Sequence, residues 1–553
     1  MLPPRRAWMW FKPDAAERRK PGDAPSKLIR AMANHVLKEL RKPSPQYRWV
    51  HRLRCFLSRV RARALAWTSD QPFKFDMIHA FPKGNPGNRQ KYRIVAEYSL
   101  ENSLICGGFS AYLRDLVDGE LESSALAFRA SVTPDTPPPT HHDAVEKILG
   151  VLSNAGPTEA LWCAEADIEG FFDAVSHDVA RRETHRLLSW VKRPTDPRLY
   201  AFLDSFLSGY DYVHSARDAA RLRLAKIGVS EPRFADPVGA LRSRGLLGPD
   251  EEPGRLGIPQ GSALSCVLAN IVLSSADTLV NAQLRARGRR EDGLYLRYCD
   301  DIVIIHRDRD LCQLALDVYC RALAGLSLPV HPPKVVAEYP GSRRLPAEEP
   351  GGFFWGGKSK APYRWGANLS CRSDVPWLAF VGYQVARDGT VRVRRSSIDK
   401  ELKKQRRVAT DIINELRKEA RKAKFEGRIH LIQDLRAVRY RATMHLLSIG
   451  VGYPSEWTTS PAPGAVSWCK GFRGMASARV VAAPLQILDR GRISVLRYLE
   501  ARVRSMLRMR QLGTIEREEE EEQPVDDHPK RREFRLDFAG APLSYRNQFK
   551  GQG

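Results

Sequence analysis

The chain has 553 residues, a formal net charge of +25 and a sequence pI of about 9.8. This length exceeds that of one compact domain, and the ordinary hydrophobic content of 43 % predicts several domains with buried cores. So large an excess of positive charge is typical of proteins that bind a polyanion, with nucleic acid as the first candidate and an anionic membrane surface as the second. A basic protein without such a partner is the alternative.

The sequence favours neither export nor membrane insertion. Residues 1–13 contain no apolar run as long as that of a signal peptide, and we find no stretch of about 18 apolar residues for a transmembrane helix. The 9 cysteines are scattered without a CxxC pair, which argues against zinc sites and disulfide frameworks. These observations predict a cytoplasmic protein with reduced thiols.

The predicted elements begin with a basic helical extension over residues 1–72, where apolar residues recur at helical spacing between arginines. A solvated charged face is the alternative interpretation. Stretches rich in proline and glycine predict linkers or irregular segments at residues 131–141, 231–256 and 339–377. Long basic helices are expected from residue 396, including one over 485–507, and the glutamate-rich tail over 516–553 is expected to be partly disordered.

Two segments place carboxylates at the ends of predicted strands. In CAEADIEGFFDAV, at residues 163–175, a mostly apolar strand ends at Asp167. In LYLRYCDDIVII, at residues 294–305, Asp300 and Asp301 lie between apolar flanks, which predicts a hairpin with both acids at its tip. Phosphoryl transfer by two metal ions needs carboxylates from at least two strands, and these two segments would supply them.

A third segment, RLGIPQGSALSCVLANIVL at residues 255–273, predicts a tight loop followed by an apolar helix. Gly257 and Pro259 form the loop, and Gly261 permits a close approach of the backbone to a bulky ligand. Such a loop is suited to contact a base pair, although an ordinary junction between a loop and a helix is the alternative.

Together these segments occur in the order DIEGFFD, GIPQGSALS, YCDD and FVGY, which resembles motifs A, B, C and E of reverse transcriptases. FPKGNPGNRQKYRIV at 81–95 resembles their fingers motif, and LSLPVHPPK at 326–334 resembles motif D. The likeness spans roughly residues 75–400.

The resemblance implies an α+β right-hand polymerase fold with fingers, a ferredoxin-like palm containing an antiparallel sheet, and a helical thumb, preceded by the N-terminal helical extension. The implied domain limits are 73–165 for the fingers with part of the palm, 166–395 for the palm with insertions at about 180–250 and 339–377, 396–515 for the thumb and 516–553 for the tail.

By this resemblance Asp167 and Asp300 would ligate two Mg²⁺ ions, with Mn²⁺ as an alternative metal. Ile168 would add its backbone carbonyl, and Asp301 would have a weaker, outer part. Lys334 would protonate the leaving pyrophosphate, and the alternative is an ordinary exposed lysine.

The resemblance also implies contacts to the nucleotide and the primer. Lys83 and Arg93 would bind the triphosphate, with Arg89 and Lys91 as neighbouring alternatives. Phe172 would be the steric gate that excludes a ribose 2′-hydroxyl, or else simply a core residue. The remaining implied contacts are those of Gln260 and Gly261 with the incoming nucleotide and templating base, and of Phe380, Gly382 and Tyr383 with the primer.

The implied reaction is attack of a primer 3′-hydroxyl on the α-phosphate of a dNTP, directed by an RNA template, with the basic helices tracking the duplex phosphates. Three alternatives remain: a polymerase that builds RNA, an untemplated or protein-primed terminal transferase using Tyr545 as a hydroxyl, and a catalytically idle RNA-binding scaffold.

We expect no ribonuclease H, integrase or Cys/His-rich endonuclease segment. The stretch FVGYQVARDGTVRVRRSS, at 380–397, resembles the stand-alone reverse transcriptases of bacterial anti-phage defence. This subgroup implies a dedicated noncoding RNA as template and a cDNA product, without a membrane partner, and leaves a homo-oligomer open.

Overall fold

The computed structural model describes residues 43, 48–83, 91–130, 138–156, 159–287, 292–335, 357–366, 374–425, 478–481 and 483–511. Arg89, Tyr545, the linker over 131–137 and the acidic tail lie outside these residues. The described chain divides into two compact units, which are treated separately here. The first includes residues up to Val381 together with Val385–Gly389, and the second includes Gly382–Gln384 and residues from Thr390 onward.

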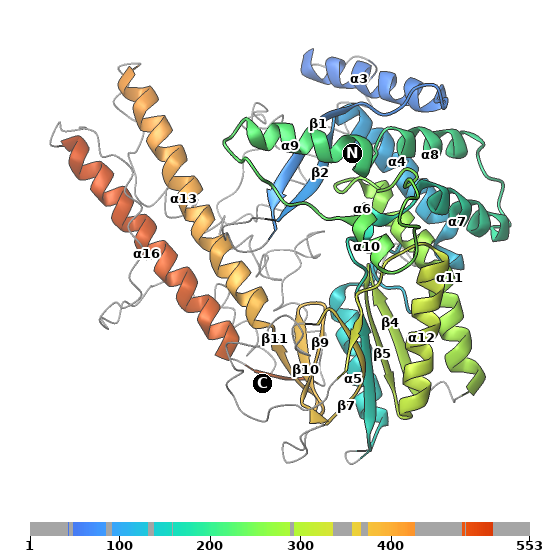
Figure 1. Ribbon diagram of the computed structural model, residues 1–553. Coiled ribbons are helices and arrows are strands. Elements are labelled where there is room, and N and C mark those ends of the chain that lie inside the picture. Colours follow the sequence, from blue (N-terminus) through green and yellow to red (C-terminus); the bar gives the residue numbers. More distant parts are fainter. Residues whose placement is uncertain are drawn as a thin grey trace. The chain divides into compact units, whose positions relative to one another are not determined.

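The first unit is built on a six-stranded sheet with the strand order β4-β5-β3-β7-β6, in which β8 also pairs with β7 (Figure 1). The pairs β4–β5, β5–β3 and β3–β7 are antiparallel, whereas β6 and β8 each pair with β7 in parallel. Its strands are β3 (Leu161–Ala166), β4 (Gly293–Tyr298), β5 (Asp301–His306), β6 (Pro333–Lys334), β7 (Ser359–Trp365) and β8 (Asp374–Val375).

Helices cover this sheet and form the main core. The long apolar helix α11 (Ala263–Arg287) contacts α4 (Leu100–Val117), α7 (His177–Trp190) and α12 (Arg309–Gly325). Helix α12 packs on β3, β5 and β7, and α5 (His141–Asn154) packs on β4. Strand β5 is buried from Ile302 to His306, since helices and neighbouring strands surround it.

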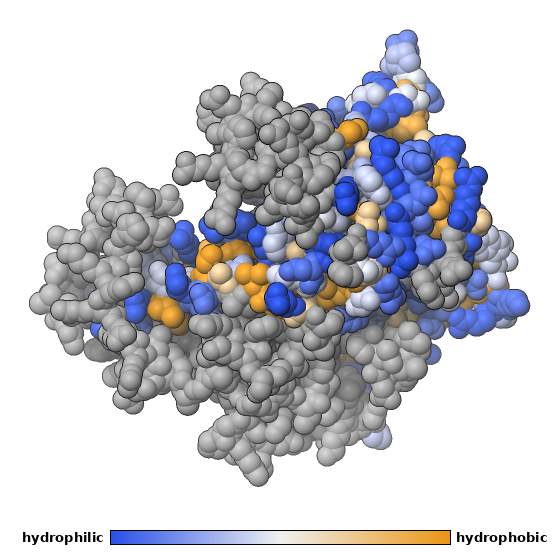
Figure 2. Space-filling model, turned by 90° about the horizontal axis from the view of Figure 1, so that it is seen from below, coloured by the Kyte–Doolittle hydropathy of each residue, from blue (hydrophilic) through white to orange (hydrophobic). Residues whose placement is uncertain are grey.

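Helix α11 is the one described helix that is long and apolar enough to cross a membrane by length and composition. The sequence predicted no such segment. Most of the helix is buried inside the first unit, which is the environment of a central core helix rather than of a lipid-facing one. On the face shown in Figure 2, the hydrophobic residues of the described chain form small groups among hydrophilic ones.

A separate hairpin consists of β1 (Phe75–Pro82) and β2 (Tyr92–Tyr98), which pair antiparallel. Alternate residues of β2 are buried, as the period of a half-buried strand requires. Its inner face packs against Tyr210, Tyr212 and residues of α9 (Arg217–Ala225). The basic helix α3 (Arg48–Leu65), the described part of the N-terminal extension, packs on α4.

The stretch predicted to be an insertion near 180–250 is largely helical. The loop prediction for 231–256 is wrong at α10 (Pro237–Ser243), because Asp236 caps this helix by accepting from Gly239 N–H and proline occupies its first turn. The other short helices of this unit are η2 (Asp118–Glu120), α6 (Phe171–Ala174), α8 (Arg198–Ser208) and the π-helical turn η3 (Tyr212–Ala216).

The prediction of an irregular stretch over 339–377 is also wrong in part. Residues 359–365 form β7, a central strand beside β3, because SKAPYRW places buried residues on both faces of the sheet. The flanking glycines and prolines hid this strand from the sequence pattern.

The chain passes into the second unit through a four-stranded sheet of order β12-β11-β10-β9. Two long helices follow the predicted pattern and pack along each other (Figure 1). Their buried residues include Ile398, Ile413, Leu488 and Val503. The elements are β9 (Trp377–Phe380), β10 (Tyr383–Ala386), β11 (Thr390–Val393), α13 (Arg395–Phe425), β12 (Arg479–Val480) and α16 (Ala483–Gln511).

Candidate active site

Asp167 and Asp300 come from neighbouring strands and lie at the same edge of the sheet. Strand β3 pairs antiparallel with β5 up to the pair Ala166–Ile302, so Asp167 follows the last pair directly. Asp300 lies in the turn between β4 and β5, immediately before that edge. Burial raises the pKa of Asp300, and the negative charge of Asp167 raises it further. The structure therefore brings together the two carboxylates that the sequence placed on separate strands.

A buried arginine forms hydrogen bonds to the turn that carries Asp300. Cys299 has a φ of 63°, in the left-handed region that non-glycine residues rarely adopt. Arg297 Nη1 donates to the Cys299 carbonyl over 3.0 Å and to Asn270 Oδ1 over 3.0 Å. The same guanidinium is paired with Asp277 of α11, so the apolar helix and the acidic turn are connected directly.

Two residues that the sequence did not single out, Lys358 and His331, lie beside Asp167. Lys358 Nζ donates to Asp167 Oδ2 over 3.1 Å, and His331 Nε2 lies 3.7 Å from the same oxygen. His331 Nδ1 lies 3.7 Å from Glu169 Oε2. Ser359 Oγ accepts from the Asp167 backbone N–H over 3.1 Å. The signal that could have revealed Lys358 is the strand pattern of the residues that follow it.

The loop at 257–261 is joined to the segment after Asp167 by backbone hydrogen bonds. Gly257 N donates to Val175 O and Ile258 N donates to Phe172 O, each over 2.8 Å. Gly257 has a φ of 95°, and a Cβ added there would lie 2.7 Å from Tyr212 Cβ, so only glycine fits.

The next residues of that loop reach the β1–β2 hairpin. The Gln260 carbonyl accepts from Ala96 N–H over 3.0 Å, and the Gln260 side chain donates to Asp173 Oδ1 over 3.0 Å. A Cβ added at Gly261, where φ is 107°, would lie 3.0 Å from Ala96 O. The predicted close approach at Gly261 is thus an approach to the neighbouring strand of the protein itself.

Lys83 and Arg93 lie at the end of the β1–β2 hairpin, where β1 residue Phe81 pairs with Arg93. Burial lowers the pKa of Lys83, and the positive charges of Arg93, Lys91 and Lys358 lower it further. These cations therefore act on one another electrostatically, as expected for side chains gathered to receive an anion. Lys91, one of the two alternatives, belongs to this group.

The remaining predicted residues are placed as follows. Phe172 is half-buried, packs on the main core and lies 5.3 Å from the Phe171 ring, between centroids. Ile168 is buried and pairs with Val330, and the flanking bonds use Asp167 O and Glu169 N rather than the Ile168 carbonyl. Asp301 is exposed at the start of β5, and Lys334 on β6 pairs with Lys360 of β7.

The FVGY segment forms the turn between β9 and β10. Phe380 and Tyr383 are buried, and Gly382 has a φ of 88°. Val381 also has a positive φ of 42°, which is rare for a β-branched residue. Both aromatic side chains are therefore buried rather than exposed at the turn.

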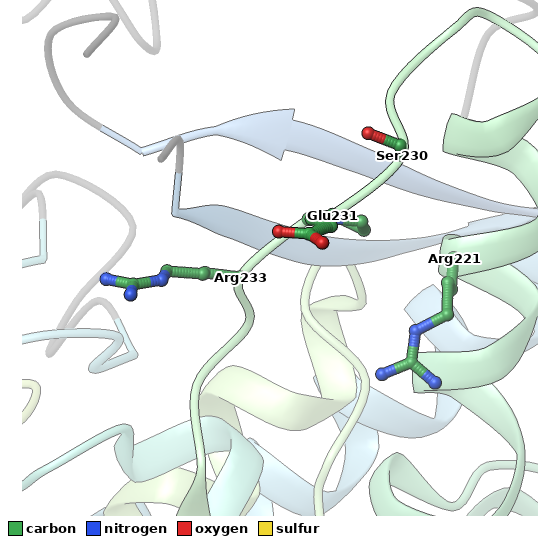
Figure 3. A pocket seen from close by; sticks show the side chains of 5 residues that line it. Arg221, Ser230, Glu231 and Arg233 are labelled. Atoms are coloured by element: carbon green, nitrogen blue, oxygen red, sulfur yellow. The ribbon is translucent and has the colours of Figure 1, made fainter. Parts of the chain in front are cut away.

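A pocket of about 400 Å³ lies elsewhere, between α9 and the loop that follows it (Figure 3). Arg221 extends from the helix, and the loop carries Ser230, Glu231 and Arg233. None of the predicted site residues lines this pocket, whose lining is Arg221, Ser230, Glu231, Pro232 and Arg233.

The residues around Asp167 fit a hard divalent cation. The Lys358 ammonium already places a positive charge against Asp167, whose side chain is only 13 % exposed, and Asp300 contributes a second carboxylate to this edge. Within the described residues no group of three or more His, Cys, Asp or Glu side chains gathers to enclose a metal. Two carboxylates supply the hard oxygen ligands that suit a divalent cation with water and substrate phosphate in the rest of its shell.

Part of this chain matches a known protein family. Residues 121–363 match the family described as "Reverse transcriptase (RNA-dependent DNA polymerase)". No match was found among curated proteins. The matched segment contains β3 with Asp167, the 257–261 loop, α11, and the β4–β5 turn with Asp300.

Solved structures with a distant similarity include telomerases from two Candida species. One is apo telomerase from Candida tropicalis truncated from its C-terminal domain, with 13 % identity, a TM-score of 0.29, and coverage of 56 % of this chain and 53 % of that one. Another is telomerase from Candida albicans with a TWJ fragment of telomeric RNA, with 14 % identity, a TM-score of 0.32, and coverage of 80 % and 67 %. This chain thus spans about half the length of the first and about two thirds of the second.

The family match and the combination of helices with a largely antiparallel sheet confirm the α+β right-hand polymerase fold. Residues 121–363, less than half of the chain, are therefore similar to the domain of an RNA-directed DNA polymerase, which is a nucleotidyltransferase.

Proposed function

We propose that this protein extends a primer 3′-hydroxyl with dNTPs on an RNA template by phosphoryl transfer at Asp167 and Asp300. The observation that carries the proposal is the position of these two carboxylates at one edge of the sheet, where the charge of one raises the pKa of the other. Two Mg²⁺ ions, or Mn²⁺ in their place, would be held by Asp167, Asp300 and the Ile168 carbonyl. Asp301 would take part more weakly, from outside this set of ligands. Bound there, the metals would neutralise the phosphate charge and polarise the reacting oxygens.

The chain's own residues would position the substrates. Lys83 and Arg93 carry positive charge at the end of the β1–β2 hairpin and would bind the triphosphate. Gln260 and Gly261 would face the nucleotide and the templating base, and Phe172 would exclude a ribose 2′-hydroxyl. Lys334 would deliver a proton to pyrophosphate, and the Phe380–Tyr383 turn would support the primer end.

Primer extension on an RNA template tests the proposal. The wild-type chain should incorporate dNTPs in Mg²⁺ and discriminate against NTPs, whereas Asp167→Asn and Asp300→Asn should lose about a thousandfold or more of the rate, because transition-state charge is no longer stabilised. Asp178→Asn is a matched control, since that side chain is 88 % exposed on α7. Incorporation without a template would instead support a terminal transferase, and activity that survives Asp300→Asn would overturn the assignment.

We infer further that the protein serves bacterial anti-phage defence in the cytoplasm, copying a dedicated noncoding RNA into cDNA. The support is the resemblance of residues 380–397 to stand-alone defence enzymes and the basic surfaces of α13 and α16, which would track duplex phosphates as a thumb. The domain limits predicted from the sequence belong to the same proposal. The proposal is compatible with a homo-oligomer as well as with a monomer.

Sequencing of the RNA and cDNA that copurify with the protein tests this role. One recurrent RNA with matching cDNA is expected from wild type, and RNA without cDNA from Asp300→Asn. Phage protection should be lost in the same variant. Protection that persists in Asp300→Asn would favour an RNA-binding scaffold and overturn the enzymatic role in defence.

A further inference from the structure

Asp173 is a buried carboxylate six residues after Asp167, and no part of the proposed reaction uses it. Its residue is only 6 % exposed. Asp173 Oδ1 accepts a hydrogen bond over 3.0 Å from Gln260 Nε2, which belongs to the 257–261 loop. A buried carboxylate is costly unless something compensates it, so its presence in this position calls for a function.

The backbone on both sides of this hydrogen bond is fixed. Asp173 N donates to Gly170 O over 2.8 Å within the turn that begins α6. The Gln260 carbonyl accepts from Ala96 N–H of β2 over 3.0 Å. The main chain of Gln260 is therefore bonded to the hairpin and its side chain to Asp173. The remaining motion of this side chain is a rotation of its terminal amide group.

Charged and titratable groups face Asp173 from each neighbouring element. Lys83, Arg93 and Lys91 of the hairpin act on the carboxylate as positive charges. In the segment before α9, burial raises the pKa values of Tyr210 and Tyr212, and the negative charge of Asp173 raises them further. The carboxylate thus accepts a hydrogen bond from the loop glutamine and lies within electrostatic range of the cations that would receive a triphosphate.

We propose that Asp173 is a positioning residue that fixes the Gln260 amide with its NH₂ group on the carboxylate and its Oε1 oxygen presented to the incoming nucleotide. An ionised carboxylate only accepts hydrogen bonds, so the amide donor must face it and the amide acceptor must face away. A neutral partner would allow the amide to turn over and present a donor instead. This inference rests on the proposed polymerase function, because it assigns the chemical character of the nucleotide-facing group.

Protonation of Asp173 would release this constraint. Burial raises the pKa of Asp173 to about 6, although the Gln260 hydrogen bond and the cations Lys83, Arg93 and Lys91 oppose the rise. The carboxylate is therefore ionised above about pH 6 and becomes a donor as the pH falls through that value. The fixed amide orientation should accordingly be present at neutral pH and lost on acidification.

Steady-state primer extension in a dNTP titration, from pH 5.5 to 8, tests the inference with Asp173→Asn, Asp173→Glu and the exposed control Asp178→Asn. Asp173→Asn should raise the KM for dNTP about tenfold, the loss expected for a hydrogen bond to a charged group, with little change in kcat. Wild type should lose kcat/KM below about pH 6, and Asp173→Asn should lack this step. Asp173→Glu, which keeps an acceptor, should recover part of the affinity.

A double-mutant cycle separates positioning from simple structural support. Asp173→Asn should cost nothing further in a Gln260→Ala background, because no amide remains to be oriented. An equal cost in both backgrounds, or an unchanged KM and pH profile in Asp173→Asn, would overturn the inference. The cycle is repeated as dNTP binding to a primer–template complex in the Asp300→Asn background, which reports on Asp173 even if turnover is absent. Failure of wild type to polymerise would count against the proposed function alone.

Discussion

Arg297 and Asp277 form an ion pair in which neither side chain is exposed to solvent at all, with Arg297 Nη2 2.6 Å from Asp277 Oδ2. Tyr295 donates to the same aspartate over 2.7 Å. The pair links α11 to the strand that leads into the Asp300 turn, so the position of a proposed metal ligand depends on a contact buried in the core.

Removal of one partner should therefore be severe. Arg297→Met leaves Asp277 charged and buried, and we expect a loss of about 3–5 kcal/mol in the free energy of unfolding, measured by urea denaturation. The double variant Arg297→Met/Asp277→Leu should be less destabilised than Arg297→Met, since no unpaired charge remains. If the double variant recovers stability but not primer extension, the arginine also positions the turn through the Cys299 carbonyl. Equal stability of the single and double variants would contradict this account.

Lys358 should compete with a divalent cation for Asp167. Its side chain is 66 % exposed, so the contact is weak, and Lys358→Ala should lower the Mg²⁺ concentration for half-maximal activity by only about twofold to fivefold. The measurement is a Mg²⁺ titration of primer extension, with the exposed Lys192→Ala as control. A higher Mg²⁺ requirement in Lys358→Ala would show that the lysine assists the metals or the substrate instead.

Gly257 should not tolerate a side chain. Its φ of 95° is unfavourable for other residues, and a Cβ would lie 2.7 Å from Tyr212 Cβ. Gly228→Ala is the matched control, because Gly228 has a φ of 83° with no atom within 4 Å of an added Cβ. Both variants should lose about 1–2 kcal/mol from backbone strain, and Gly257→Ala should lose a further 1–3 kcal/mol or so from the clash. Thermal denaturation measures the difference, and equal losses would mean that Tyr212 moves aside.

Phe172 is proposed as the gate against ribonucleotides. Phe172→Ala should raise the ratio of kcat/KM for NTP to that for dNTP by about tenfold or more, because a steric exclusion is removed. Single-nucleotide incorporation on a primed RNA template measures this ratio. Since Phe172 also packs on the core, some loss of stability is expected in either case. A loss of stability with an unchanged ratio would leave it as a core residue only.

Much of this protein follows from local sequence. Strand-end aspartates, the glycine loop feeding an apolar helix, and the basic helices from about residue 396 all have short-range patterns, because hydrophobic period and glycine conformation are properties of neighbouring residues. The fold class followed from the resemblance of the ordered motifs to those of reverse transcriptases, and α13 and α16 lie where helices were expected.

Other features are invisible to such patterns. β7 was hidden by flanking glycines and prolines, and α10 by its loop-like composition, although its aspartate cap and following proline were readable signals. Lys358 drew no attention as one exposed lysine among 89 basic residues, and only its distance from Asp167 distinguishes it.

The sequence by itself determined which residues carry charge, where strands end and where glycine gives the backbone freedom to turn, since these depend on each residue and its neighbours. Tertiary structure alone decided which distant residues meet: Asp167 with Lys358, Asp173 with Gln260, and Arg297 with Asp277. The physical reason is that a hydrogen bond or ion pair depends on a few ångströms of separation in space, and strand register and helix packing set that separation.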